Sequence, residues 1–135
     1  MITLSQEIIG FINLFEKLTG AAVKDCFLEE GKIVFVINPG NMGLAIGKNG
    51  SNIKHASAVL KKTVNIIEFN PDPVLFIKSL LFPIKPKEVK LQDTTILIVP
   101  NDIKEKGKIY GRERTNLKRM QDIASKYFPI TIKIE

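Results

Sequence analysis

One order of secondary-structure elements occurs twice in this chain, and that repeat limits the folds open to it more than any other feature. Apolar periodicity and turn residues predict a helix, two strands, a short helix, a glycine loop, a longer helix and a strand, and then the same series again. In the first half the expected elements lie at residues 5–18, 22–28, 32–37, 41–46, 51–62 and 64–69. In the second half they lie at residues 73–82, 87–92, 95–99, 101–109, 115–127 and 130–134.

The two halves align when Gly47 is matched to Gly111, which is a shift of 64 residues. Identity is low but the apolar pattern is kept, so an internal duplication explains the match better than chance does. The segment Asn70 to Pro73 is rich in proline, which predicts a stiff connection between domains at residues 1–70 and 71–135. Other matched pairs are Gly43 with Gly107, Ile46 with Tyr110, Asn52 with Asn116, Ile53 with Leu117, and Val59 with Ile123.

The first glycine loop has the chemistry of a phosphate-binding site. Residues 46–53 fit the pattern Ile-Gly-x-x-Gly-x-x-Ile. Glycines without a β-carbon let a nucleic-acid backbone come close, and the loop opens a helix whose free N–H groups and dipole attract phosphate. Lys48 adds charge, Asn49 adds donors, and Ile46 and Ile53 are expected to fix the two helices to the core. A plain helix–helix turn is the structural alternative, but the surrounding order of elements favours RNA.

In that setting the chain resembles the KH family, whose GxxG loop holds about four nucleotides of single-stranded nucleic acid. Two strands before the loop helices and one after them match the type II arrangement. The resemblance implies an α+β fold of two tandem type II (αββααβ) KH domains, each a three-stranded mixed sheet with helices on one face. Two such domains in so short a chain resemble the archaeal NusA family, which acts in transcription elongation, termination or antitermination.

The resemblance implies single-stranded RNA as the ligand and RNA polymerase as a candidate protein partner. The first loop, in residues 1–70, is intact, whereas the second, in residues 71–135, keeps Gly111 but has Arg114 in place of the second glycine. The implied RNA-binding residues of the first domain are Ile46, Gly47, Lys48, Asn49, Gly50, Asn52, Ile53 and Lys54. Those of the second domain, expected to act by charge, are Gly111, Arg112, Arg114, Lys118 and Arg119. The alternative for the second loop is that it only braces the first domain.

Charge supports a polyanionic partner. The chain has 20 Lys and Arg against 14 Asp and Glu, a net charge of +6, and most of the excess lies after residue 70. Lys and Arg bind nucleic acids by neutralising phosphates and releasing counterions. All three arginines, Arg112, Arg114 and Arg119, fall in one short window at the start of an expected helix, where cations oppose the helix dipole. A modest positive charge that only aids solubility is the alternative.

Other function classes find little support in the sequence. The chain has one His and one Cys, which leaves no internal disulfide and no cysteine-based metal cluster, and it lacks a Walker-type phosphate loop. We therefore expect no catalytic residues, no metal and no cofactor. No apolar stretch approaches the length of a membrane span, and the expected location is the cytoplasm. The alternatives to a NusA-type function are a KH protein that acts on ribosomal RNA and a protein-docking module.

Overall fold

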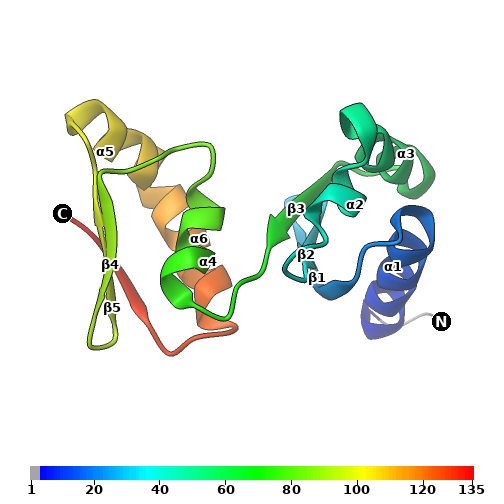
Figure 1. Ribbon diagram of the computed structural model, residues 1–135, viewed down its shortest axis with the longest axis horizontal. Helices are drawn as coiled ribbons and strands as arrows, with labels where there is room; N and C mark the ends of the chain where they lie inside the picture. Colours follow the sequence, from blue (N-terminus) through cyan, green and yellow to red (C-terminus); the bar gives the residue numbers. More distant parts are fainter. Residues whose placement is uncertain (1–3) are drawn as a thin grey trace. The chain divides into compact units, whose positions relative to one another are not determined.

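The computed structural model describes residues 4–135, and these residues form two compact units (Figure 1). The first unit ends at Phe69 and the second begins at Asn70. Each unit is built of helices and its own three-stranded mixed sheet, which confirms the predicted α+β class and the predicted mixed sheets. None of the helices in residues 4–135 is long and apolar enough to cross a membrane.

The first unit follows the predicted order of elements, with a short 3-10 turn inside the glycine loop. Its strands lie in the order β1-β2-β3, with β1 antiparallel and β3 parallel to the central strand β2. The elements are α1 (Leu4–Thr19), β1 (Val23–Glu29), β2 (Lys32–Ile37), α2 (Met42–Ile46), the 3-10 turn η1 (Lys48–Gly50), α3 (Ser51–Leu60) and β3 (Val64–Glu68).

The second unit repeats this arrangement. Its strands lie in the order β4-β5-β6, again with one antiparallel and one parallel neighbour for the central strand. The elements are α4 (Pro73–Leu81), β4 (Glu88–Gln92), β5 (Thr95–Val99), α5 (Ile103–Tyr110), the 3-10 turn η2 (Arg112–Arg114), α6 (Thr115–Ser125) and β6 (Thr131–Ile134).

Each unit has a separate hydrophobic core. In the first, alternate residues of β2 pack with Phe15 of α1, whose ring stacks on Phe35 at 4.2 Å between centroids. In the second, Ile96 and Ile98 of β5 pack with Ile109 of α5 and Met120 of α6. Figure 1 shows α4 and α6 on one side of the β4–β5 ribbon. A sheet covered by helices in this way leaves the glycine loop at the junction of two helices, away from the core.

Candidate nucleic-acid interface

The first glycine loop turns the chain sharply between α2 and α3. Gly47 has φ 74° and ψ 173°, a combination that is open in practice only to glycine. Asn49 and Gly50 follow in the left-handed region, with φ of 56° and 75°. The amide of Gly50 donates to the carbonyl of Gly47 at 3.2 Å, which closes the turn.

Asn52 holds this turn in place. Its side-chain Nδ2 donates to the carbonyl oxygen of Leu44 in α2 at 2.7 Å and so ties the start of α3 to the preceding helix. The side chain passes directly under Gly47, where an added β-carbon would lie 2.6 Å from Asn52 Cγ and 2.8 Å from Asn52 N. Gly47 is therefore required by the fold, both for its backbone angles and for the space that Asn52 occupies.

Gly50 differs from Gly47 in the space around its α-carbon. A β-carbon built there meets no atom within 4 Å, so the protein itself leaves the space above this residue open. Its left-handed angles favour glycine but are also adopted by other residues, Asn and Asp above all. The open space at Gly50 is available to a ligand that must approach the backbone closely.

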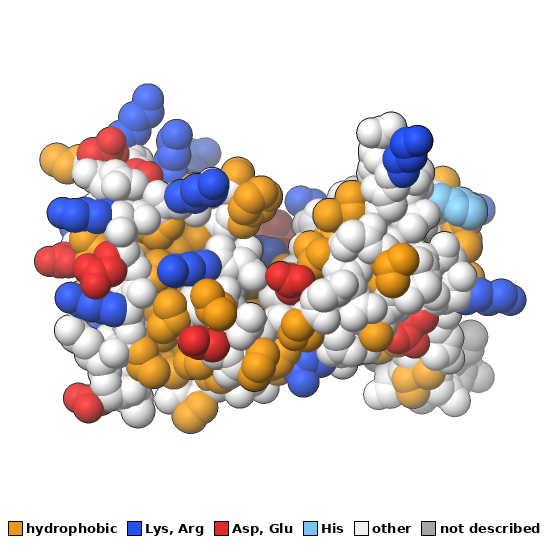
Figure 2. Space-filling view, viewed as in Figure 1, with side chains coloured by type: hydrophobic (Ala, Val, Ile, Leu, Met, Phe, Trp, Pro, Cys, Tyr) orange, Lys and Arg blue, Asp and Glu red, His pale blue; other side chains and the backbone are white. Residues whose placement is uncertain are grey.

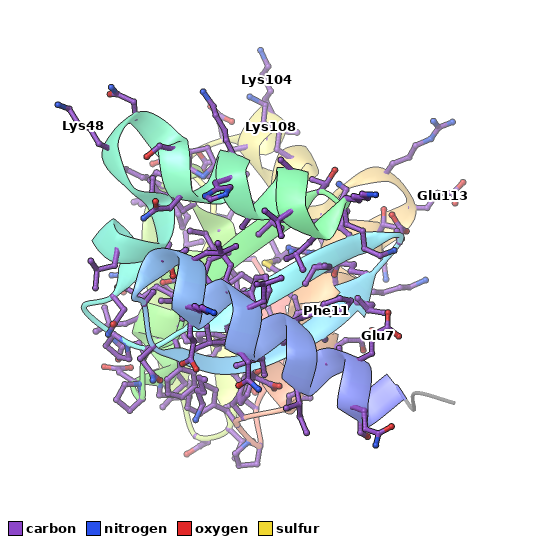
Figure 3. All side chains as sticks on the ribbon, turned by 90° about the vertical axis from the view of Figure 1, so that its right-hand side faces the viewer. Glu7, Phe11, Lys48, Lys104, Lys108 and Glu113 are labelled. Carbon is purple, nitrogen blue, oxygen red and sulfur yellow. The ribbon has the colours of Figure 1, made fainter. Side chains whose placement is uncertain are left out.

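The side chains around the first loop are mostly open to solvent. Lys48, Asn49 and Lys54 are exposed, and Lys48 points outward from the loop (Figure 3). Ile46 is 38% exposed and Ile53 is half-buried, so the expectation that these two fix the helices to the core is wrong. The fully buried Ala45 and Ala56 do that, and Met42 at the start of α2 also packs against the core. Ile46 and Ile53 remain available as an apolar floor beside the loop.

The second loop has the same backbone as the first in spite of its different sequence. Gly111 has φ 71° and ψ 171°, Glu113 has φ 55°, and Arg114 takes the left-handed angles of Gly50 with φ 62° and ψ 20°. Asn116 is equivalent to Asn52, because its Nδ2 donates to the carbonyl of Ile109 in the preceding helix at 2.9 Å. A β-carbon on Gly111 would lie 2.7 Å from Asn116 Cβ. Loss of the second glycine thus changes the surface of the loop and leaves its path intact.

Positive charge surrounds the second loop. Arg112, Arg114 and Lys118 are exposed, while Arg119 is half-buried and has a partner within the protein. Figure 2 shows Lys and Arg side chains gathered over α5, the helix that leads into the loop. Lys104 and Lys108, one turn apart on α5, point outward in Figure 3 and were missed by the sequence analysis, although their spacing of four residues was visible.

Comparison with known proteins agrees with this geometry. A family model described as "KH domain" matches residues 12–135. The chain is 38% identical over 128 residues to the probable transcription termination protein NusA of Methanococcus vannielii, a match that covers 93% of this chain and 74% of the relative. The chain belongs to the family of archaeal NusA-like KH proteins.

Other members of the NusA-like family show similar agreement. The protein named probable transcription termination protein NusA in Methanocaldococcus jannaschii is 30% identical, with 96% of this chain and 73% of the relative covered. The protein of the same name in Halobacterium salinarum is 31% identical, and the match covers 96% of this chain and 94% of that relative. The crystal structure of APE1850 superposes with a TM-score of 0.77 at 27% identity, over 99% of this chain and all of the other.

The asparagine below each KH loop gives a test of what holds the loop. We expect Asn52→Ala to lower the free energy of unfolding of the first unit by about 1 kcal/mol, because the bond to Leu44 is lost. Asn52→Asp should cost more, since it keeps the shape of the side chain but places a carboxylate against that carbonyl. Denaturant unfolding of the two variants measures both values, and an Asp variant as stable as the wild type would contradict the role given to the bond.

Proposed function

We propose that this NusA-like protein binds single-stranded RNA through the loop at Gly47–Gly50 and acts in transcription elongation, termination or antitermination. The observation that carries the proposal is the open space at Gly50, on a turn held rigidly by Asn52 and flanked by exposed Lys48. A β-carbon built on Gly50 meets no atom within 4 Å, so no neighbouring side chain blocks the close approach of a sugar–phosphate backbone to this residue. The proposed place of action is the cytoplasm, and RNA polymerase is the protein partner that this role implies.

The ends of the helices support an anionic ligand. Aspartates cap α4 and α5, where Asp72 accepts from the amide of Val74 and Asp102 accepts from that of Glu105. Within residues 4–135, no side chain caps α3 or α6, the two helices that follow the glycine loops, and neither has an acidic residue in its first turn. An aspartate there would repel phosphate, whereas uncapped N–H groups attract it. No side chain thus caps the two helix starts at which we place RNA, and the one carboxylate in either loop is the exposed Glu113 before α6.

We further propose that the two units are tandem type II KH domains, at residues 1–70 and 71–135. Their matching element order, strand pairing and loop angles support this division. Both loops lie next to exposed cations. The RNA contacts that we propose for the first unit are Ile46, Gly47, Lys48, Asn49, Gly50, Asn52, Ile53 and Lys54. Those that we propose for the second unit are Gly111, Arg112, Arg114, Lys118 and Arg119. Action on ribosomal RNA is the alternative within the same chemistry.

The test of this function is the double substitution Lys48→Asp with Asn49→Asp. Both side chains are exposed, so the fold should persist, while added negative charge beside a bound phosphate should lower RNA affinity by about 30-fold or more. Labelled single-stranded RNA and a duplex of the same sequence are titrated with protein at several salt concentrations. The wild type should prefer the single strand, because its unstacked bases are accessible.

A matched control uses Lys17→Asp with Asn13→Asp. These residues are exposed on α1, far along the chain from the loop, and the pair introduces the same change in charge. If both double variants lose affinity equally, only the overall charge matters and the loop is not the site. A folded loop variant with wild-type affinity would place RNA elsewhere, and preference for the duplex would count against KH-type binding.

A further inference from the structure

Two of the residues in which the loops differ are the last residue of the helix before the loop and the fourth residue of the loop motif. In the first unit these residues are Ile46 and Gly50, and the space above Gly50 is empty. In the second unit they are Tyr110 and Arg114, and the Arg114 guanidinium lies over the Tyr110 ring at 5.6 Å from its centroid. Where the first unit has the open space at Gly50, the second thus carries the Arg114 side chain, in contact with an aromatic ring.

The position of this pair is set by the fold. Tyr110 follows the fully buried Ile109, and the amide of Gly111 donates to the carbonyl of Gly107, so the end of α5 is fixed. The backbone of Arg114 is held by the turn, since its amide donates to the carbonyl of Gly111 at 3.2 Å. Tyr110 is half-buried, whereas Arg114 is exposed, so the guanidinium is accessible to a ligand.

An arginine over an aromatic ring suits a nucleobase. Unpaired RNA bases stack on aromatic rings and on arginine guanidinium groups, and every base offers such a face. An exposed cation–π contact is weak, so a base can stack on the Arg114 guanidinium or take its place over the Tyr110 ring at little cost. Arg112 and Lys118, which are also exposed, flank Arg114 along the chain and carry the positive charge that phosphates attract.

We propose that Tyr110 and Arg114 form a base-stacking site, with which the second unit holds an unpaired RNA base in place of the close backbone contact made by the first. This inference rests on the proposed RNA binding and adds to it a residue, Tyr110, and a chemical group, the base. In this proposal the first unit binds an RNA backbone and the second unit binds an RNA base. The second unit should therefore favour purines, whose larger faces stack more strongly.

The composition of the chain gives a direct optical test. The protein has no Trp and only two Tyr, Tyr110 and Tyr127. Tyr127→Phe keeps a ring against Phe76, which Tyr127 meets edge-on at 5.6 Å, and leaves Tyr110 as the only tyrosine. Binding is followed by the anisotropy of labelled single-stranded RNA, and stacking by the quenching of tyrosine emission in the same titration. We expect RNA binding to quench the emission of Tyr110.

Three substitutions in the Tyr127→Phe background separate stacking from charge. Tyr110→Phe keeps the ring and should leave RNA affinity unchanged, whereas Tyr110→Ile, which copies the first unit, should lower it roughly five- to fiftyfold. Arg114→Lys keeps the charge but removes the plane and should lower affinity by a similar factor. A circular dichroism melt of each variant confirms that it is folded.

The possible outcomes are distinct. Full affinity with unquenched Tyr110, or wild-type affinity for Arg114→Lys, would overturn the stacking site while RNA binding itself stands. A gain in affinity on Arg114→Gly would show that the arginine obstructs the groove, and would also overturn it. If the wild type does not bind RNA at all, the proposed function is wrong, and the stacking site that depends on it is wrong too.

Discussion

Changing Gly50 to Asp is expected to lower the affinity for single-stranded RNA by about 100-fold, or about 3 kcal/mol, while the first unit stays folded. The fold should persist because Asp tolerates left-handed angles and its β-carbon would meet no atom within 4 Å. Binding should fail because the side chain fills the space into which the RNA backbone must come, and because its charge then lies beside a phosphate. Anisotropy titration with labelled RNA measures the loss.

Gly50→Asn separates bulk from charge in this experiment. It has the shape of Asp and the same tolerance of left-handed angles, but no charge. We expect an intermediate loss, roughly tenfold, if close approach matters in its own right. If Gly50→Asp binds like the wild type, the ligand does not enter at this residue, and the first loop is not the clamp.

The second large effect is on stability and comes from Gly47→Ala. We expect it to lower the free energy of unfolding of the first unit by about 3 kcal/mol or more, because the required φ and ψ are strained for Ala and its β-carbon would overlap Asn52. The clash involves the backbone nitrogen of Asn52 as well as its side chain, so a rotamer change does not relieve it. Gly50→Ala is the matched control and should cost only about 1 kcal/mol, since only the left-handed strain applies.

Each unit carries its own probe for this measurement. Cys26, the single cysteine, is 5% exposed in the first core, and burial together with the charge of Asp25 raises the pKa of its thiol to about 12. The folded first unit should therefore resist thiol reagents, and the labelling rate reports how often it opens. Both tyrosines belong to the second unit and report on it. Gly47→Ala should speed labelling of Cys26 and leave the tyrosine signal unchanged; equal labelling of the Gly47→Ala and Gly50→Ala variants would contradict the steric account.

Most of the fold could be predicted because apolar spacing, glycines and prolines mark the elements directly. Strand ends differ from the expected ones by at most a single residue, and the larger differences lie at helix ends. The helix expected at residues 51–62 ends at Leu60, because Lys61 adopts a left-handed φ of 56° and caps it. The helix expected at 115–127 ends at Ser125. Where a helix ends depends on which of its last backbone carbonyls find hydrogen-bond donors, and no residue pattern in this chain predicts that.

The site was predicted less completely than the fold. The glycine motif located the loop and its exposed cations, but it did not show that Asn52 turns its amide back to Leu44, or that Ile46 stays exposed. Both facts depend on how α2 and α3 cross. Sequence reasoning also took Arg114 as a departure from the loop, whereas its backbone angles match those of Gly50. A signal was present, because asparagine stands at the same place in both halves.

The pairing of Gly47 with Asn52, repeated as Gly111 with Asn116, has a consequence for how such loops diverge after duplication. The glycine and the asparagine five residues later fix the path of the chain, and at the fourth position of the motif the fold requires only left-handed backbone angles. A duplicated copy can therefore exchange that glycine for a functional side chain in one step without losing its shape. A sequence motif that gives both glycines equal weight would reject the second copy as a degenerate, non-functional loop. One that requires glycine followed by asparagine at that spacing would retain both copies.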